Sequence, residues 1–287
     1  MDARSRVLIT AAELARLIRA HEPVTVLDVR WQFDEPDQYA AYLQGHVPGA
    51  VYVSLEDELS DRTVAGRGRH PLPSGDSIEA AARRWGVRDD TLVVAYDDWN
   101  RVGSARAWWV LTAAGLDNVR ILDGGLVAWR SAEGHLDTGS VTPQVGNVTV
   151  PQRDLYAGNL PTLTAQHCGG GGLTLIDTRV PERFRGDVEP IDPVAGHIPG
   201  AKNIPSTAVL AGDGTFLDQS ALHRILAAHN IENIGTADHV GVYCGSGVTA
   251  TVTIAAFAAI GCVVPLFPGS WSEWISDPAR PVARGPG

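Results

Sequence analysis

Cys244 has the surroundings in this sequence that point most directly to chemistry. It follows the apolar run Val240–Tyr243, and Gly245 and Gly247 come directly after it, before an apolar helical pattern. The two glycines permit a tight turn. We expect that turn to direct the backbone N–H groups of residues 246–250 inward at the start of a helix, where an anion is stabilised. A thiolate is such an anion, so the sequence predicts a nucleophilic cysteine.

The rest of this loop is predicted to hold the substrate. Its backbone N–H groups form the expected anion cradle, so the predicted substrate-binding positions include Gly245, Gly247, Val248 and Thr249. The alternative is that Cys244 is a small buried thiol that only closes a strand. An inert cysteine does not need a Gly-x-Gly turn and a helix start directly after it.

Composition narrows the class of protein. The chain has 287 residues and a net charge of -10, and no basic stripe offsets that charge, which argues against nucleic acid as a partner. The first ten residues lack a signal peptide pattern, and the apolar runs suit buried elements better than a membrane span. Three cysteines of irregular spacing indicate a reducing compartment, and we expect a cytoplasmic protein. No cluster has metal-ligand spacing, so no metal site is expected.

Four pairs of matched segments show that the chain is an internal duplication. The members of each pair lie about 150 residues apart, and the pairs occur in the same order in both halves. The pairs are VLDVR at 26–30 with LIDTR at 175–179, GHVPGA at 45–50 with GHIPGA at 196–201, VVAYDD at 93–98 with VGVYCG at 240–245, and LDGGLVAW at 122–129 with FPGSWSEW at 267–274. A repeat of this length is a domain.

Each repeat is predicted to be an α/β domain. Short apolar runs such as 24–28, 91–96 and 119–122 alternate with helical patterns at 11–20, 78–85 and 104–114. This alternation favours a parallel sheet with helices on both faces. The predicted boundaries are 1–140 for the first domain, 141–160 for a linker and 161–287 for the second domain. The apolar run 248–266 is predicted to form a buried helix followed by a strand.

These motifs together resemble the tandem-domain rhodanese family. The resemblance rests on the paired repeats, the GHxPGA boxes, the DGGxxxW and GSWSEW ends and the CGSGVTA loop, and it covers essentially the whole chain. It implies two tandem rhodanese-like domains and a sulfurtransferase. Sulfane sulfur would pass from 3-mercaptopyruvate or thiosulfate to a Cys244 persulfide, and then to a thiol acceptor such as thioredoxin or to cyanide. No cofactor beyond that covalent intermediate is implied.

The resemblance also implies that only one of the two repeats is catalytic. The first repeat has Asp97 where the second has Cys244, so the first domain is expected to be catalytically silent. In mercaptopyruvate sulfurtransferases, a serine of the cysteine loop is proposed to act with a histidine and an aspartate of the first domain. By resemblance, these residues are Ser246, His46 and Asp37, and they would manage a proton on the departing enol.

The charges near the cysteine loop bear on which sulfur donor the protein uses. Rhodaneses that favour thiosulfate resemble one another in an Arg-Lys pair after the cysteine, whereas this chain has uncharged residues there and looks like the mercaptopyruvate type. The resemblance implies that Arg183 binds the donor carboxylate. A second arginine is expected in 187–195, which contains three acidic residues and no basic one. Either another cation, such as Arg179, Arg185 or Arg101, works with Arg183, or the donor is not mercaptopyruvate.

Two other functions compete with this one. A cysteine phosphatase of related fold needs an arginine six positions after the nucleophile, and that position here is Ala250. A catalytically weak sulfur carrier or regulatory binding module is the alternative that stays open. A catalytically dead binding module is expected to lose its cysteine, whereas this chain keeps Cys244 inside a complete loop.

Overall fold

The chain forms two compact units. The computed structural model describes residues 2–132, 134–231, 234 and 239–286. The first unit consists of Met1–Asp61, Leu72–Asn159 and Leu210–Phe216, and the second of Arg62–Pro71, Leu160–Val209 and Leu217–Gly287. Each unit thus takes one short segment from the part of the chain that mainly builds the other. The domain boundaries expected from the sequence do not anticipate these two segments and otherwise stay a prediction.

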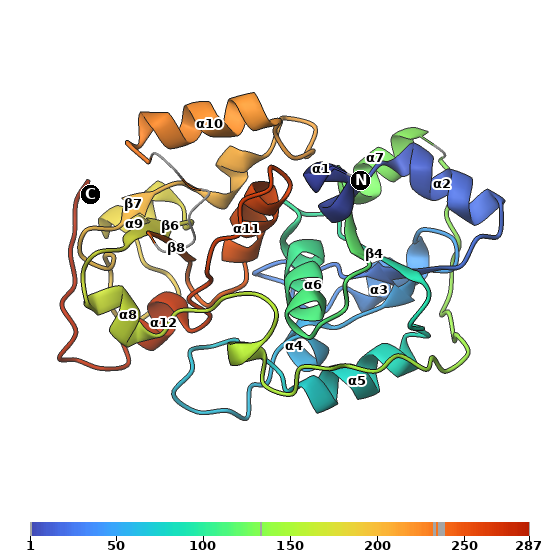
Figure 1. Cartoon of the computed structure of the whole chain (residues 1–287), viewed down its shortest axis with the longest axis horizontal. Coiled ribbons are helices and arrows are strands. Elements are labelled where there is room, and N and C mark those ends of the chain that lie inside the picture. Colours follow the sequence, from blue (N-terminus) through green and yellow to red (C-terminus); the bar gives the residue numbers. More distant parts are fainter. Residues whose placement is uncertain (1, 133, 232–233, 235–238, 287) are drawn as a thin grey trace. The chain divides into compact units, whose positions relative to one another are not determined.

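The first unit is built on a parallel sheet of five strands in the order β1-β5-β4-β2-β3. Figure 1 labels its strand β4. The strands are β1 Leu8–Ile9, β2 Val24–Asp28, β3 Val51–Tyr52, β4 Leu92–Tyr96 and β5 Val119–Leu122. Strand β2 pairs along its whole length with β4, and both are apolar runs whose carboxyl-terminal halves are buried. Burial on both faces is what such continuous apolar runs predict.

The helices of the first unit begin where their sequences supply caps. Thr10 and Glu13 form a capping box at α2, and the Ser74 hydroxyl caps α5. Helix α6 is buried along nearly its whole length, so it carries no polar stripe. The helices are α1 Ala3–Val7, α2 Ala11–Arg19, α3 Tyr39–Gln44, α4 Leu55–Glu58, α5 Gly75–Arg84, α6 Val102–Ala113, α7 Gly125–Ala132 and the 3₁₀ turn η1 Leu155–Ala157.

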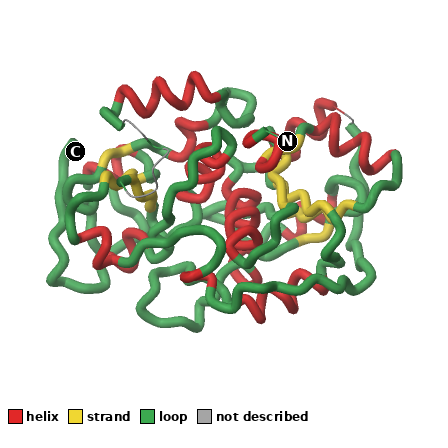
Figure 2. Tube along the Cα trace, in the orientation of Figure 1, coloured by secondary structure: helices red, strands yellow, loops and turns green. Residues whose placement is uncertain are grey.

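The second unit has a smaller parallel sheet in the order β7-β6-β8. Figure 2 draws the strands of both sheets in yellow. Its strands are β6 Thr174–Asp177, β7 Lys202–Asn203 and β8 Val240–Tyr243. Leu266 adds isolated bridges to Val242 and Thr162, although a full strand was expected there. Its helices are α8 Ala165–Gly169, α9 Pro181–Arg185, α10 Gln219–Ala228, α11 Ala250–Ala258 and α12 Ser270–Trp274, with the 3₁₀ turn η2 Ser206–Val209.

The two units repeat the same buried ion pair, at the end of β2 in the first unit and of β6 in the second. In the first unit Arg30 binds Asp28 at 2.6 Å and donates to the carbonyl of Gly45. In the second unit Arg179 binds Asp177 at 2.6 Å and donates to the carbonyl of Gly196. All four charged side chains are nearly or fully buried. Because the contact occurs in both units and only one of them has a cysteine loop, the contact does not depend on that loop.

The histidines of the two GHxPGA boxes also make matching contacts. His46 Nδ1 lies 3.0 Å from the carbonyl oxygen of Tyr42, and its ring stacks on Tyr42. His197 Nδ1 lies 2.8 Å from the carbonyl oxygen of Phe184, and its ring stacks on Phe184. Both rings are buried. Each histidine therefore fixes the turn that its box forms.

Among the described residues, no helix combines the length and the apolar character needed to cross a bilayer.

Candidate active site

Cys244 lies directly beyond the carboxyl end of β8 and is almost fully buried. Both sides of its peptide are fixed: its N–H donates to Ser270 Oγ at 3.1 Å, and its carbonyl accepts from Trp271 N at 3.0 Å. Parallel sheets place their working loops at this end of the strands. The cysteine is therefore held by α12 at the position where the fold presents chemistry.

The turn after Cys244 requires glycine at one position. Gly247 has φ of +78°, and a Cβ added there would lie 2.2 Å from the carbonyl oxygen of Pro268. This conformation brings the Gly247 N–H to 3.2 Å from Cys244 Sγ. The turn thus places a backbone N–H donor against the sulfur of Cys244.

The remaining loop residues shape the turn through their backbones. The carbonyl of Gly245 accepts from Ser272 N at 2.9 Å, and the carbonyl of Val248 accepts from the Thr251 hydroxyl at 2.7 Å. Thr249 occupies the N-cap of α11 in a helical conformation. The loop thus reaches the helix that follows it, as expected. Contact of these residues with a substrate stays a prediction.

Ser246 has a histidine partner, and that partner is His70. The distance from His70 Nδ1 to Ser246 Oγ is 2.8 Å, and both residues are buried. His70 belongs to the segment Arg62–Pro71, which is part of the second unit. The family resemblance implied His46 for this role. The structure instead puts His70 on the serine beside the nucleophile, and an Arg/Gly-rich loop that ends in His-Pro was the only local signal for it.

The other two residues of the expected relay make contacts inside the first unit. His46 holds its turn as described above, and its Nε2 atom is buried without a hydrogen-bond partner among the described residues. Asp37 accepts from the Tyr39 N–H at 3.0 Å and from the Tyr52 hydroxyl at 3.4 Å. Their catalytic roles stay a prediction from the resemblance.

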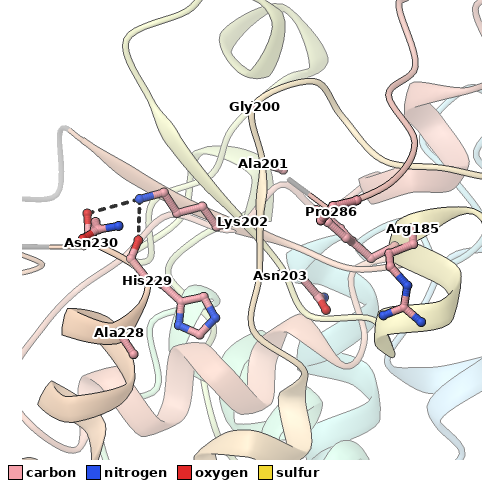
Figure 3. Close-up of a pocket in the computed structure, with 10 residues that line it drawn as sticks. Arg185, Gly200, Ala201, Lys202, Asn203, Ala228, His229, Asn230 and Pro286 are labelled. Atoms are coloured by element: carbon pink, nitrogen blue, oxygen red, sulfur yellow. Dashed lines mark hydrogen bonds between the residues drawn. The ribbon is translucent and has the colours of Figure 1, made fainter.

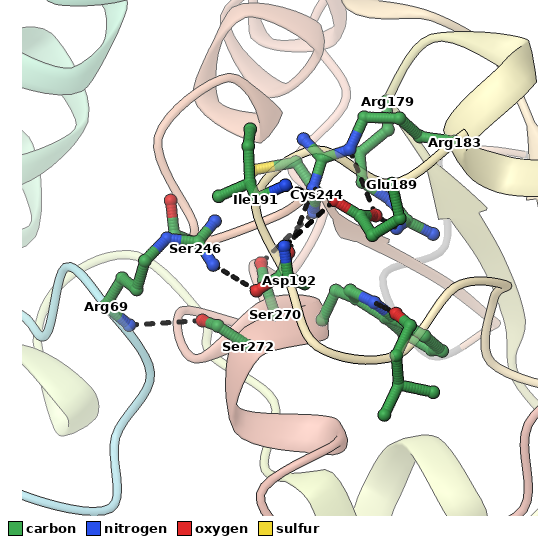
Figure 4. Close-up of polar contacts among 12 residues, drawn as sticks. Arg69, Arg179, Arg183, Glu189, Ile191, Asp192, Cys244, Ser246, Ser270 and Ser272 are labelled. Carbon is green, nitrogen blue, oxygen red and sulfur yellow. Dashed lines mark hydrogen bonds and ion pairs between the residues drawn. The ribbon is translucent and has the colours of Figure 1, made fainter. Parts of the chain in front are cut away.

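Two arginines border the residue that follows the nucleophile (Figure 4). A Cβ built on Gly245 would lie 3.2 Å from Arg69 Nη2 and 3.6 Å from Arg183 Nη1. Arg183 comes from α9 and is 8 % exposed. Arg69 comes from the same segment as His70, and its backbone N–H donates to Ser272 Oγ at 3.1 Å. Arg69 is therefore a second cation beside the cysteine loop, and the sequence did not indicate it.

Acidic side chains from the 187–195 segment bind these arginines. Glu189 makes a two-pronged contact with Arg183, with Nη2 to Oε1 at 2.7 Å and Nε to Oε2 at 3.1 Å. Asp192 accepts from Arg183 Nη2 at 2.9 Å through one oxygen and pairs with Arg69 through the other. Asp187 instead pairs with the half-exposed Arg185. Two of the three acids thus neutralise the arginines beside the cysteine loop.

The other cations considered from the sequence have other partners. Arg179 is held by Asp177 and also lies 3.4 Å from Glu189. Arg101 belongs to the first unit and pairs with Asp97 at 3.2 Å. Donor binding by Arg179 stays a prediction, and the matched ion pair of the first unit argues against it.

Comparison with known proteins identifies the fold. The model of the rhodanese-like domain matches residues 10–132 and again residues 160–277. The chain belongs to the rhodanese family. Its full-length similarity to relatives named as sulfurtransferases makes it a sulfurtransferase, as the resemblance implied.

Similar rhodanese proteins span the full length of the chain. A Mycobacterium tuberculosis protein named "Putative thiosulfate sulfurtransferase SseB" is 69% identical over 285 residues, which are 99% of both chains. A Pseudomonas aeruginosa protein named "Probable 3-mercaptopyruvate sulfurtransferase" is 44% identical over 287 residues, which are 98% of this chain and 99% of that one.

Two solved structures have the same fold as this chain. SseA from Escherichia coli, described with the rhodanese fold of 3-mercaptopyruvate sulfotransferases, has a TM-score of 0.78 at 30% identity and covers 92% of this chain and 98% of its own. Tum1 from Saccharomyces cerevisiae shares the fold, with a TM-score of 0.85 at 20% identity and full coverage of both chains.

The first rhodanese domain fills its own cysteine position with a carboxylate. Asp97 follows β4 as Cys244 follows β8, and it is fully buried. Its Oδ2 accepts from the N–H of Ser104 at 2.9 Å and from the hydroxyl of the same residue at 2.6 Å. Its Oδ1 accepts from Trp99 N at 3.1 Å. The hydrogen-bond donors that could stabilise an anion in this loop therefore bind the carboxylate of Asp97.

The second rhodanese domain also has a cavity away from the cysteine loop (Figure 3). Its volume is about 430 Å³, and it lies between α9, β7 and the end of α10. Lys202 lines it, and its ammonium donates to the carbonyls of His229 and Asn230. The ammonium of Lys202 is thus used to cap a helix.

Proposed function

We propose that this chain moves sulfane sulfur from a small anionic donor, through a persulfide on Cys244, to a thiol acceptor such as thioredoxin or to cyanide. One observation carries the proposal: the buried thiol of Cys244 receives the Gly247 N–H and lies in a loop flanked by a Ser-His pair and by two arginines. Nucleophile, proton carrier and anion-binding groups are the parts that such a transfer needs.

In the first half-reaction, the Cys244 thiolate attacks the sulfur to be transferred. With thiosulfate, a new S–S bond forms to the cysteine, the sulfur–sulfur bond of the donor breaks, and sulfite leaves with the electron pair. With 3-mercaptopyruvate, the carbon–sulfur bond breaks, and its electron pair passes to the enolate of pyruvate. In both cases the cysteine becomes a persulfide, and the donor fragment has to leave before the acceptor enters.

The two donors differ in their need for a proton. Sulfite leaves as a stable anion, whereas the enolate of pyruvate has to be protonated. Ser246 and His70, 2.8 Å apart beside the nucleophile, are proposed to supply that proton as a general acid pair. His70 replaces His46 in this proposal.

In the second half-reaction, an acceptor thiolate attacks the outer sulfur of the persulfide. The outer sulfur forms a bond to the acceptor, its bond to Cys244 breaks, and the cysteine leaves as a thiolate. With cyanide as acceptor, a carbon–sulfur bond forms and thiocyanate departs. Because the donor fragment leaves before the acceptor reacts with the persulfide, ping-pong kinetics are expected.

We propose 3-mercaptopyruvate as the preferred donor. Gly245 and Ser246 bring no cation into the loop, and Glu189 and Asp192 offset much of the charge of Arg183. Acidic groups repel a dianion about twice as strongly as a monoanion at the same distance. Thiosulfate is a dianion, and mercaptopyruvate carries one carboxylate for Arg183 to bind. The names of the relatives include both donors, so kinetics have to decide.

The test is a comparison of kcat/KM for the two donors with cyanide as a common acceptor. We expect mercaptopyruvate to give the higher value. Efficient use of thiosulfate with almost no use of mercaptopyruvate would reverse the donor assignment and leave the persulfide step intact.

We also propose a cytoplasmic location. All three cysteines of the chain are free thiols, as expected in a reducing compartment.

A further inference from the structure

Arg69 contains a buried N–H group that the fold leaves unused. Its Nη1 pairs with Asp192, but its Nη2 is buried and has no hydrogen-bond partner among the described residues. Buried polar atoms are nearly always hydrogen-bonded, so an exception calls for a reason. A bound anion would supply the acceptor that this N–H group needs.

The unused group is placed beside the nucleophile. Arg69 Nη2 lies 3.2 Å, and Arg183 Nη1 3.6 Å, from the point where Gly245 would carry a Cβ. Two guanidinium groups therefore converge on Gly245, the residue that follows Cys244, and Figure 4 shows Arg69 and Arg183 approaching from different segments. Planar guanidinium groups are suited to carboxylates and to other oxyanions.

The segment that carries Arg69 is fixed in place. The Arg69 N–H donates to Ser272 Oγ at 3.1 Å. At the preceding Gly68, an added Cβ would lie 2.5 Å from the carbonyl oxygen of Gly269. This close backbone approach anchors the segment on α12, which also holds Cys244. Arg69 is therefore positioned by the same helix as the nucleophile.

Asp192 ties the two arginines together. One carboxylate oxygen pairs with Arg69 and the other with Arg183 at 2.9 Å, and the Asp192 side chain is 2 % exposed. With Glu189 also on Arg183, two acids balance two arginines. A sulfur donor that carries negative charge thus meets two guanidinium groups in a cluster whose net charge is zero. The negative charge of Asp192 therefore weakens the binding of a dianionic sulfur donor more than that of a monoanionic one.

We propose that Arg69 is the second donor-binding arginine of the site and that Asp192 selects against dianionic donors. This inference rests on the proposed sulfur transfer for its kinetic test. Anion binding by Arg69 can also be measured without any transfer.

The first experiment measures donor kinetics of Arg69→Gln, Arg69→Lys and Asp192→Asn at pH 7. The matched control is Arg67→Gln, an exposed arginine of the same segment. We expect Arg69→Gln to raise KM for mercaptopyruvate about tenfold or more, with a smaller change in kcat, because a charged hydrogen bond is lost. Arg69→Lys should recover part of that loss. Arg67→Gln should behave as the wild type.

Asp192→Asn is expected to act in the opposite direction. It should raise kcat/KM for both donors, and the factor for thiosulfate should be about the square of that for mercaptopyruvate, since Coulomb energy scales with ligand charge. A decrease with both donors, or equal factors, would overturn the role given to Asp192.

The second experiment uses sulfate as an unreactive dianion that protects Cys244 from iodoacetamide. The sulfate concentration for half-protection should rise about tenfold in Arg69→Gln and fall in Asp192→Asn. If the wild type forms no persulfide but sulfate protection follows this order, the proposed function fails and the anion site stands. Wild-type KM and wild-type protection in folded Arg69→Gln would overturn the assignment of Arg69.

Discussion

His70 and Ser246 lie 176 positions apart in the chain, yet His70 Nδ1 is 2.8 Å from Ser246 Oγ. Both side chains are buried in the second unit, and Ser246 is two residues from Cys244. A hydroxyl held by an imidazole can carry a proton to a leaving group. The contact therefore predicts which histidine the reaction needs and with which donor.

We expect His70→Asn to lower kcat for mercaptopyruvate by about a hundredfold, within the usual range for loss of a general acid. Thiosulfate turnover should change little, because sulfite needs no proton. Stopped-flow measurement of pyruvate and sulfite release checks this. The matched variant His46→Asn removes a histidine that contacts Tyr42 and should affect thermal stability more than kcat. The opposite pattern, with His46→Asn selectively losing mercaptopyruvate turnover, would restore the role inferred from the resemblance.

Arg183→Ala is expected to reduce both activity and stability. KM for mercaptopyruvate should rise about tenfold or more through loss of a charged contact. Because Arg183 is buried with Glu189 and Asp192, its removal leaves two buried carboxylates without this partner, which costs about 3–5 kcal/mol for a broken buried pair. Urea unfolding measures that cost.

Glu189→Gln separates the two effects of Arg183. It removes one buried charge and keeps the arginine, so the double variant Arg183→Ala/Glu189→Gln should regain stability but not the low KM. A double variant with wild-type KM would show that Arg183 does not bind the donor.

Cys168 should resist alkylation in the native protein. Burial, with the Glu273 charge nearby, raises the pKa of this thiol to about 12. Below that pKa the thiol is protonated, so at pH 8 only about one part in ten thousand is the reactive thiolate. Iodoacetamide labelling followed by peptide mass analysis should find Cys168 unmodified until the pH approaches 12 or the protein unfolds. Burial also raises the pKa of Cys262, so this thiol should be labelled slowly too.

The parts of the fold that local patterns encode could be predicted from the sequence. The strand expected at 24–28 is β2, and the helix expected at 78–85 begins earlier, at Gly75, because the Ser74 hydroxyl caps it. The cysteine loop was predictable because its strand, glycines and helix are contiguous. Matched motifs also revealed the duplication, which the two rhodanese matches confirm.

The distant half of the site could not be predicted in this way. Arg69 and His70 reach the cysteine loop because the segment Arg62–Pro71 packs on α12 through glycine contacts. No periodicity or capping signal in that segment specifies such a contact across the chain. The GHxPGA histidine was the more prominent candidate, but its repetition in both units reflects a shared structural role.

The most direct test of the account is the mass of the intact protein after reaction with donor in the absence of acceptor. The wild type, Cys168→Ser and Cys262→Ser should each gain one sulfur atom, and peptide mapping should place it on Cys244. Cyanide should remove it as thiocyanate. Cys244→Ser should gain none and release no thiocyanate. A Cys244→Ser protein that still acquires the sulfur, or releases thiocyanate at near the wild-type rate, would contradict the mechanism.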